Sequence, residues 1–158
     1  GAVVRAGRPE RLVIAGPPGW SGGPRAVSAA AEAFGDRVLL TGPLRSDRLV
    51  ALYRGASLFA FPSIHEGFGL PVLEAMAQEV AVVCSDIPVL REVAGAAARY
   101  APATDADAWG EILVELLRDD PERSRMGVAG RHRAGEFTWE RCVRQTRACY
   151  REVVAAAR

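Results

Sequence analysis

The sequence predicts an α/β fold in which a Rossmann-like parallel sheet carries helices on both faces. Two observations lead to this prediction. Strand-like apolar runs alternate with segments of helical periodicity along most of the chain, which is the order typical of a parallel sheet with crossover helices. The chain has 158 residues, of which 49% are hydrophobic and 25% charged, which suits a single globular domain over residues 1–158.

The first half of the chain is expected to contain three strands. Their apolar runs lie at residues 11–15, 38–41 and 58–61. A short helix is predicted over residues 24–34, and Gly35-Asp36 turns the chain into the second strand. Ser46 is expected to cap the next helix, over Asp47–Arg54, because a serine hydroxyl accepts hydrogen bonds from first-turn N–H groups.

The second half is expected to be richer in helix. The helices are predicted over residues 70–78, 88–94, 104 or 105 to 118, 120–133 and 138–156. Pro88 and Pro121 suit a first helical turn, where a missing N–H costs little. Residues 80–84 read as a fourth strand, and a weak edge strand is predicted near Arg99-Tyr100.

The last predicted helix has one apolar stripe, which we expect to face a partner surface. Its members recur at spacings of three and four: Trp139, Cys142, Val143, Thr146, Cys149, Tyr150 and Val153. The three cysteines of the chain are widely spaced and lack a CxxC pattern. All three are therefore expected to act as small buried hydrophobic residues.

Composition excludes several classes of function. The net charge of +1 gives no reason to expect nucleic-acid binding. No apolar run is long enough for a transmembrane helix, and the N-terminus does not resemble a signal peptide. We therefore expect a cytoplasmic protein, with the cytoplasmic face of the membrane as the alternative for the full-length form. The sequence contains no lysine and no asparagine, which weakly favours a bacterial source with GC-rich codons.

The candidate site lies in residues 62–77. A strand-like run leads into Glu66-Gly67-Phe68-Gly69, and a helix-like segment begins at Leu70. Strand, glycine turn and helix form the arrangement that binds phosphate on backbone N–H groups. Two carboxylates, Glu66 and Glu74, lie eight positions apart and supply acceptors for hydroxyl groups. Phosphate together with several hydroxyls suggests a nucleotide sugar, although glycines alone would also fit a tight turn without a ligand.

Glu74 strengthens the functional interpretation. Its helical neighbours are nearly all apolar, so its carboxylate lies at an exposed edge or is buried with a partner, because an unpaired buried charge is very costly. Ribose hydroxyls would be suitable donors. The spacing by itself leaves the functional and the purely structural interpretations equally open.

These residues resemble a known family. His65-Glu66-Gly67-Phe68-Gly69-Leu70-Pro71-Val72-Leu73-Glu74-Ala75-Met76-Ala77 is similar to the Glu-x7-Glu motif of the retaining GT-B glycosyltransferases, called group 1 or family 4. The likeness covers nearly the whole chain, which resembles the C-terminal, donor-binding half of these enzymes. Segments 38–44, 49–56, 85–93 and 137–140 resemble the family on both sides of the motif.

The resemblance implies a role for each site residue. Glu66 would be the catalytic carboxylate beside the donor sugar, and Glu74 would bind the ribose hydroxyls. The backbone of Gly67, Phe68, Gly69 and Leu70 would bind the diphosphate and the sugar. The loop of Thr41, Gly42, Pro43 and Leu44 would lie against the base. Such enzymes need no metal or other cofactor, and the sequence has no cluster typical of a metal site.

The chain departs from the family in two places. Glu79 stands where the family has a glycine after the signature helix, so either this residue is strained or the helix ends differently. In addition, Gly1–Gly7 resemble the end of the family's first helix, so the resemblance implies that residues 1–158 do not include the first strand, its Arg/Lys pair or the N-terminal acceptor domain. Arg45, Arg54 and Arg91 could replace that charge, but a surface or salt-bridge role is favoured for each.

The absent strand is central in a sheet of order 3-2-1-4-5-6. Its loss would expose strand edges, which favour self-association. We therefore expect residues 11–15 to pair with residues 58–61, or another chain to fill the gap. Without its acceptor half, the isolated chain is expected to be inactive. A non-catalytic nucleotide-sugar-binding module of the same fold is the alternative function. A sugar-nucleotide epimerase or phosphorylase is a weaker one, and the phosphorylase would need a lysine.

Overall fold

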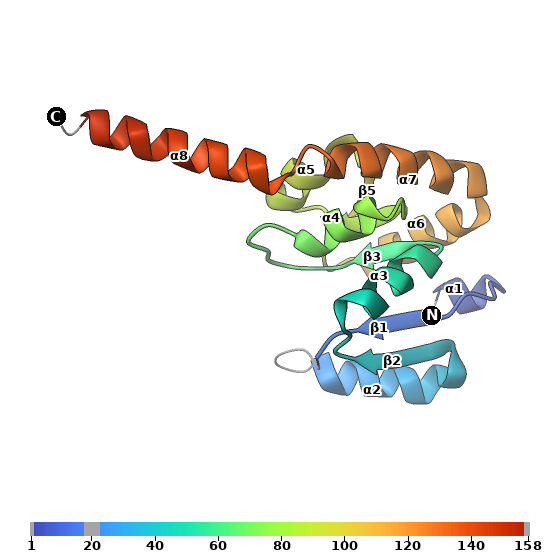
Figure 1. Cartoon of the computed structure of the whole chain (residues 1–158). Coiled ribbons are helices and arrows are strands. Elements are labelled where there is room, and N and C mark those ends of the chain that lie inside the picture. Colours follow the sequence, from blue (N-terminus) through green and yellow to red (C-terminus); the bar gives the residue numbers. More distant parts are fainter. Residues whose placement is uncertain (1, 18–22, 157–158) are drawn as a thin grey trace.

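The computed structural model describes residues 2–17 and 23–156 and confirms the α/β fold. Helices and parallel strands alternate along the chain (Figure 1). The strands are β1 (Leu12–Ala15), β2 (Val38–Gly42), β3 (Phe59–Phe61), β4 (Val82–Ser85) and β5 (Ala98–Ala101). The helices are α1 (Ala2–Arg5), α2 (Gly23–Phe34), α3 (Ser46–Gly55), α4 (Leu70–Ala77), α5 (Pro88–Ala94), α6 (Ala106–Arg118), α7 (Asp120–Ala134) and α8 (Trp139–Ala156). Two short 3₁₀ turns, Gly35–Arg37 and Gly95–Ala97, precede β2 and β5.

The strands form two separate parallel sheets. One has the order β1-β2, with Leu12 opposite Val38, and the other has the order β3-β4-β5. The prediction that residues 11–15 pair with residues 58–61 is therefore wrong. The strand β3 pairs instead with β4, which is buried along its whole length, and Phe59 lies opposite Val82. The connecting helix α3 packs its Tyr53 edge-to-face on Phe59, with ring centroids 5.3 Å apart. In Figure 1 the unpaired edges of β1 and β3 face each other.

Residues 2–11, the described part of the chain before β1, contain no strand. The described residues 2–5 form α1, which packs against α6, in agreement with the predicted helical end. An open position thus remains between β1 and β3 in the described part of the chain. Open backbone edges are the feature that recruits an additional strand.

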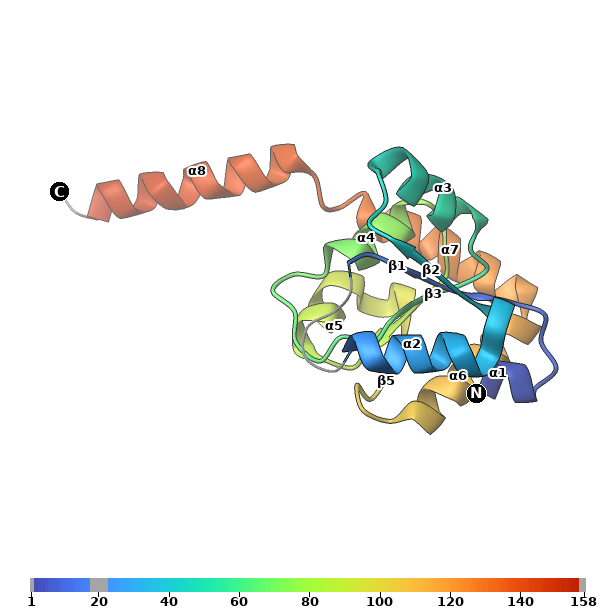
Figure 2. The ribbon, with the colours of Figure 1, turned by 90° about the horizontal axis from the view of Figure 1, so that it is seen from below.

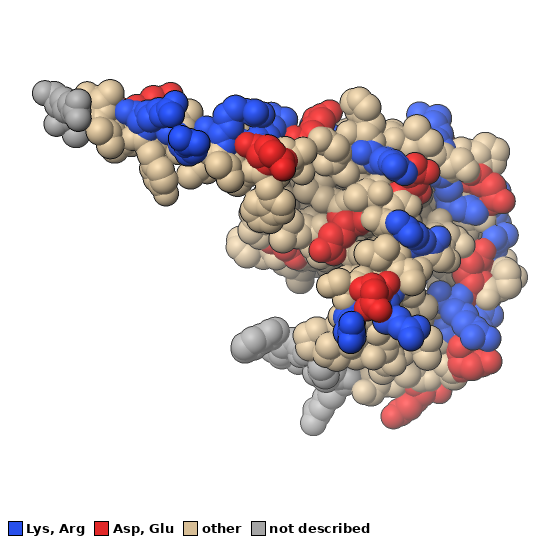
Figure 3. Space-filling view, viewed as in Figure 1, with Lys and Arg blue, Asp and Glu red and all other residues tan. Residues whose placement is uncertain are grey.

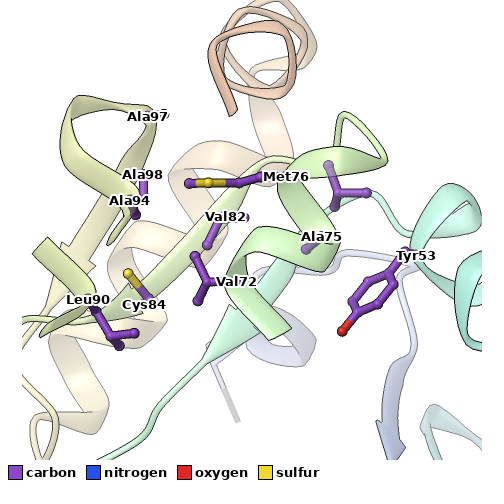
Figure 4. Close-up of a cluster of buried hydrophobic side chains, with 11 residues drawn as sticks. Tyr53, Val72, Ala75, Met76, Val82, Cys84, Leu90, Ala94, Ala97 and Ala98 are labelled. Carbon is purple, nitrogen blue, oxygen red and sulfur yellow. The ribbon is translucent and has the colours of Figure 1, made fainter. Parts of the chain in front are cut away.

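The hydrophobic core lies on both faces of the β3-β4-β5 sheet. Val82 and Cys84 of β4 point to the cluster under α4 and α5, where Met76 and Leu90 are fully buried (Figure 4). Val83 points to the opposite face and packs with residues of β5, α6 and α7, namely Ala101, Trp109, Leu116 and Met126. Every residue of β4 is buried, as expected for a strand covered by helices on both sides. Burial raises the pKa of the Cys84 thiol to about 12.

Side-chain caps are present at the starts of α6 and α8 and absent at the start of α3. The carboxylate of Asp105 accepts from the N–H groups of Asp107 and Ala108 at the start of α6. Thr138 likewise accepts from Arg141 at the start of α8. Ser46 does not cap α3: the helix begins at Ser46 itself, and Arg45 occupies the cap position without a side-chain hydrogen bond. An extended Arg45 backbone is sufficient to start this exposed helix.

The chain leaves α4 through a strained residue. Glu79 has φ 61°, which is the only positive φ of a residue other than glycine among the described residues. This geometry confirms the left-handed alternative expected for the position. The carboxylate of Glu79 also pairs with Arg131 of α7, at 2.7 Å between Oε1 and Nη1. Tertiary contacts thus hold an angle that glycine would adopt without strain.

We expect Glu79→Gly to raise the free energy of unfolding by about 0.5–1 kcal/mol, because glycine is the preferred residue at a left-handed helix end. The lost ion pair offsets little of this gain, because both of its side chains are largely exposed. Urea denaturation would measure the change. Arg131→Ala removes the pair and keeps the strained angle, so it should leave stability nearly unchanged. A lower stability of the glycine variant would contradict the argument.

Helix α8 leaves the body of the molecule and extends away from it (Figures 1 and 2). Its apolar stripe is exposed: Trp139 is 79% and Tyr150 69% exposed. The prediction that this stripe faces a partner surface has no match among residues 2–17 and 23–156. Cys142 and Cys149 are exposed on the same helix, so the expectation of burial is correct only for Cys84. Helical periodicity identified the stripe, but it does not identify what covers it.

None of the helices in the described part of the chain combines the length and the apolar character that crossing a membrane requires.

Candidate functional site

The candidate site is the loop between the end of β3 at Phe61 and the start of α4 at Leu70. The arrowheads of β1, β2 and β3 point to the same side of the molecule, and the loop projects from that side (Figure 1). The space-filling view shows a hollow there, between the part holding α4 and the part holding β1, β2 and α2 (Figure 3). Ligands of open α/β sheets bind at this edge of the strands.

Gly69 is required by the backbone of this loop. It is buried, has φ 94° and is the N-cap residue of α4. A Cβ atom at this position would lie 2.6 Å from Cδ2 of Leu90. Gly67 differs, because its φ is not positive and a Cβ there would meet nothing within 4 Å. The fold therefore explains Gly69, whereas nothing in the described part of the chain requires a glycine at position 67.

Four consecutive backbone N–H groups are available at the start of α4. Those of Gly67, Phe68, Gly69 and Leu70 donate to no acceptor in the described part of the chain. The first bond of this turn is made by Val72, whose N–H donates to the Gly69 carbonyl at 3.0 Å. Free N–H groups and the positive end of the helix dipole together favour an anion.

A serine holds the first carboxylate of the motif. The hydroxyl of Ser63 lies 2.8 Å from Oε1 of Glu66 and 3.1 Å from the carbonyl oxygen of His65. Glu66 is partly buried, and the structure gives it one side-chain partner. The Glu66 carboxylate is therefore held by Ser63 and keeps acceptor capacity for a ligand.

A buried tyrosine holds the second carboxylate. The hydroxyl of Tyr53, on α3, donates to Oε2 of Glu74, on α4, at 3.2 Å. The Tyr53 residue is only 7% exposed, whereas Glu74 is exposed. Burial, followed by the negative charge of Glu74, raises the pKa of Tyr53, so its hydroxyl stays protonated and donates. Glu74 thus occupies the exposed edge of the helix, one of the two positions expected for it.

Two apolar residues of the motif remain largely exposed. Phe68 is 42% and Leu70 55% exposed. The Phe68 ring contacts the ring of Phe137 edge-to-face, with centroids 5.9 Å apart. The Arg133 guanidinium lies over the Phe137 ring. The segment between α7 and α8 therefore supports the loop from outside. Exposed apolar side chains beside free N–H groups suit a ligand with both polar and apolar parts.

The loop that the family resemblance places against the base lies at the carboxyl end of β2, in the other sheet. It comprises Thr41, Gly42, Pro43 and Leu44, which lead directly into α3. Gly42 has φ 65°, and its carbonyl accepts from the Gly16 N–H at 3.0 Å and from the Thr41 hydroxyl at 2.9 Å. The same helix α3 that begins after this loop carries Tyr53 to Glu74, so one element connects both parts of the candidate site.

The three candidate arginines are all engaged with other side chains. Arg45 pairs with Asp47 at 3.5 Å, and Arg54 donates to Oε1 of Gln78 at 2.8 Å. Arg91 makes a bidentate pair with Asp86 and stacks on Tyr100. The hydrogen bonds from Arg91 hold the pKa of the Asp86 carboxyl below its usual value. These contacts agree with the surface or salt-bridge roles favoured from the sequence.

Sequence reasoning missed Ser63 and Tyr53. A serine three residues before a loop carboxylate is a recognisable local signal, because such hydroxyls bond to nearby groups. Tyr53 had no such signal, since it lies 21 residues before Glu74 and meets it only through the packing of α3 on α4. In the described residues, no three His, Cys, Asp or Glu side chains gather as a metal site would require.

A family model described as "Glycosyl transferases group 1" matches residues 5–133. Among curated proteins, the chain is 41% identical to the O-antigen chain mannosyltransferase B of Escherichia coli over 70% of this chain and 29% of that protein. It is 36% identical to the D-inositol 3-phosphate glycosyltransferase of Salinispora tropica, over 93% of this chain and 32% of that protein. The chain thus spans about a third of the length of these relatives.

A solved structure agrees with this match. The sucrose-phosphate synthase of Thermosynechococcus elongatus superposes with a TM-score of 0.82 at 27% sequence identity. The superposition covers 98% of this chain and 41% of that chain. The parallel strands and flanking helices described above are therefore shared with a longer protein.

Proposed function

Because this chain belongs to the group 1 glycosyltransferases, we propose that it is the donor-binding half of a retaining enzyme that moves a sugar from a nucleotide diphosphate sugar to an acceptor hydroxyl. One observation carries the proposal. Four free N–H groups at the start of α4 are flanked in sequence by two carboxylates, and each carboxylate accepts a hydrogen bond from a hydroxyl group of the chain. Anion donors flanked by hydroxyl acceptors complement a sugar diphosphate.

Each part of the site has a role in this proposal. The N–H groups of Gly67–Leu70 bind the diphosphate and the sugar, and Glu66 lies beside the sugar as the catalytic carboxylate. Glu74 binds the ribose hydroxyls, and the base lies against the Thr41–Leu44 loop. The free N–H groups stabilise the negative charge that develops on the departing diphosphate, which is an electrostatic contribution to the transition state. We propose that no metal takes part.

The acceptor half belongs to the rest of the protein in this proposal. The chain spans about a third of its curated relatives, and the open position between β1 and β3 is suited to one additional parallel strand. The isolated chain is therefore proposed to bind donor but not to transfer sugar. Normal turnover by residues 1–158 alone would contradict this part of the proposal.

The sugar class follows from the relatives. The names of two of them, the Escherichia coli protein and the MMP alpha-(1->4)-mannosyltransferase of Mycolicibacterium hassiacum, specify mannosyl transfer. The second is 36% identical to this chain, over 84% of this chain and 33% of that protein. We therefore propose a hexosyltransferase. Its location is proposed to be the cytoplasm or the cytoplasmic face of the membrane, where nucleotide sugars are the donors.

Calorimetric titration of the full-length protein with UDP, GDP and ADP tests the proposal. One of the three is expected to bind, and Glu74→Ala should weaken that binding about 10- to 100-fold, since hydrogen bonds to a charged group contribute about 1.5–3 kcal/mol. Glu115→Ala is the matched control, because Glu115 is an exposed carboxylate of α6 that pairs with Arg99 away from the loop. Unchanged nucleotide affinity in the Glu74 variant would remove the ribose assignment.

A non-catalytic nucleotide-sugar-binding module of the same fold is the second candidate function. The upstream reading frame discriminates between the two. An upstream α/β domain, as long as the part of the relatives that this chain does not match, would support the enzyme. A reading frame without such a domain would support the module.

A further inference from the structure

Glu74 is an exposed side chain on a helix, yet its carboxylate is held by a hydrogen bond from a buried tyrosine. Glutamate has three rotatable side-chain bonds, and fixing them costs up to about 2 kcal/mol of conformational entropy. An unsupported glutamate on the surface of α4 would therefore have many orientations. Here one carboxylate oxygen, Oε2, accepts a hydrogen bond from Tyr53 at 3.2 Å. The other oxygen, Oε1, has no partner in the described part of the chain.

The donor is rigid. The Tyr53 ring is packed in the core cluster that includes Val72 and Ala75 (Figure 4). It also contacts the Phe59 ring edge-to-face. Ring packing of this kind leaves the hydroxyl a single direction, at the boundary between core and solvent. The high pKa that burial gives to Tyr53 keeps the proton on its oxygen at neutral pH.

We propose that Tyr53 is a positioning residue for ligand binding: its hydroxyl holds Oε2 of Glu74 so that Oε1 is presented to the ribose hydroxyls of the donor. This inference rests on the proposed function and adds to it the residue that sets the orientation of the carboxylate. It also explains why a tyrosine rather than a phenylalanine occupies a core position of α3. The ring supplies the packing, and the hydroxyl extends the core to the site.

A purely structural role for the hydroxyl makes a different prediction. If Tyr53 only satisfied its own buried oxygen, removing that oxygen would change stability without changing the selectivity for ribose. The two roles are therefore separated by comparing one nucleotide with and without its sugar hydroxyls. The probes are the best-binding nucleoside diphosphate among UDP, GDP and ADP, and its 2′,3′-dideoxy counterpart.

Tyr53→Phe in the full-length protein should lower the affinity for the ribonucleotide about 3- to 10-fold, which corresponds to one hydrogen bond. The affinity of the variant for the dideoxy nucleotide should stay within about 2-fold of that of the unmodified protein. The ratio of ribonucleotide affinity to dideoxynucleotide affinity therefore falls. Tyr100→Phe is the matched control, because Tyr100 also has a packed ring, but its hydroxyl donates to the Gly95 carbonyl at 2.6 Å. It should leave the ratio unchanged.

Glu74→Ala and the double variant complete the test. Glu74→Ala should abolish the preference for ribose, and adding Tyr53→Phe to it should cause no further loss, because residues acting as one unit are not additive. If Tyr53→Phe keeps the unmodified protein's ratio of ribonucleotide to dideoxynucleotide affinity while Glu74→Ala loses it, the positioning role alone is overturned. A full ratio in Glu74→Ala overturns the ribose assignment and this inference together. Equal losses for both nucleotides show a structural role and also overturn the inference.

Discussion

The Gly127→Ala variant is expected to lose about 3 kcal/mol of folding free energy, which is at the upper end of overpacking effects. Gly127 lies on the face of α7 that packs on the end of α4. A Cβ atom there would lie 2.1 Å from the carbonyl oxygen of Glu79 and 2.9 Å from its carbonyl carbon. Both are backbone atoms, so no flexible side chain can move aside. They also belong to the residue already strained at φ 61°.

Thermal denaturation would measure the loss, which corresponds to a fall in melting temperature of roughly 6–12 °C for a chain of this size. Gly55→Ala is the control, because Gly55 ends α3 with φ in the ordinary range and a Cβ there meets nothing within 4 Å. Alanine favours helix over glycine, so this variant should be neutral or slightly more stable. Equal melting temperatures for the two variants would show that α7 can shift away from α4 without cost.

Under the proposed function, Glu66→Ala is expected to lower the sugar-transfer rate of the full-length protein about 100-fold or more, while the affinity for the nucleoside diphosphate changes less than about 3-fold. Sugar transfer develops positive charge at the anomeric centre, and a fixed carboxylate beside it contributes electrostatic stabilisation in the transition state. Ser63 keeps the Glu66 carboxylate in place at 2.8 Å. The effect should therefore fall on the intact donor and on kcat, since the free nucleotide lacks the sugar.

Steady-state transfer assays and nucleotide titrations on the same preparation would separate the two effects. Glu115→Ala serves again as the carboxylate control and should keep both turnover and affinity. Ser63→Ala should give an intermediate loss of turnover, because it leaves the carboxylate present but unsupported. A Glu66 variant with normal turnover would contradict the catalytic assignment. A variant that loses nucleotide affinity and turnover equally would instead place Glu66 against the nucleotide.

These two predictions concern opposite sides of α4. Its buried face meets α7 at Gly127 and carries the stability of the domain, and its first turn and exposed edge carry the proposed chemistry. Met76 is fully buried on the same short helix that presents Glu74. The packing of α4 therefore sets the position of the carboxylates, and a loss of packing would also disturb the site.

Much of this architecture could be predicted because its signals are local. Alternating apolar runs and helical periodicity placed all five strands and seven of the eight helices within a few residues. The loop that starts at Glu66 was recognisable because glycines, a carboxylate and a helix start follow each other directly. The conformation of Glu79 could be stated as one of two alternatives, since a helix end without glycine has few solutions.

The remaining features depend on segments far apart in the sequence. The contact of Tyr53 with Glu74 joins α3 to α4, and no periodicity in either segment predicts it. The predicted pairing of β1 with β3 was wrong, because strand propensity identifies a strand but not the strand with which it pairs. The exposure of Cys142 on α8 was missed for the same reason: an apolar stripe shows that a helix has a face, not that this chain covers it.

The sequence by itself determined the α/β fold class, the order of the elements and the position of the candidate loop, because backbone propensity and turn chemistry act over a few residues. Only the tertiary structure decided that the strands form two sheets, that Gly69 is needed for its backbone while Gly67 is not, and that Ser63 and Tyr53 hold the two carboxylates. These features arise from side-chain packing and backbone approach, which depend on where distant segments meet.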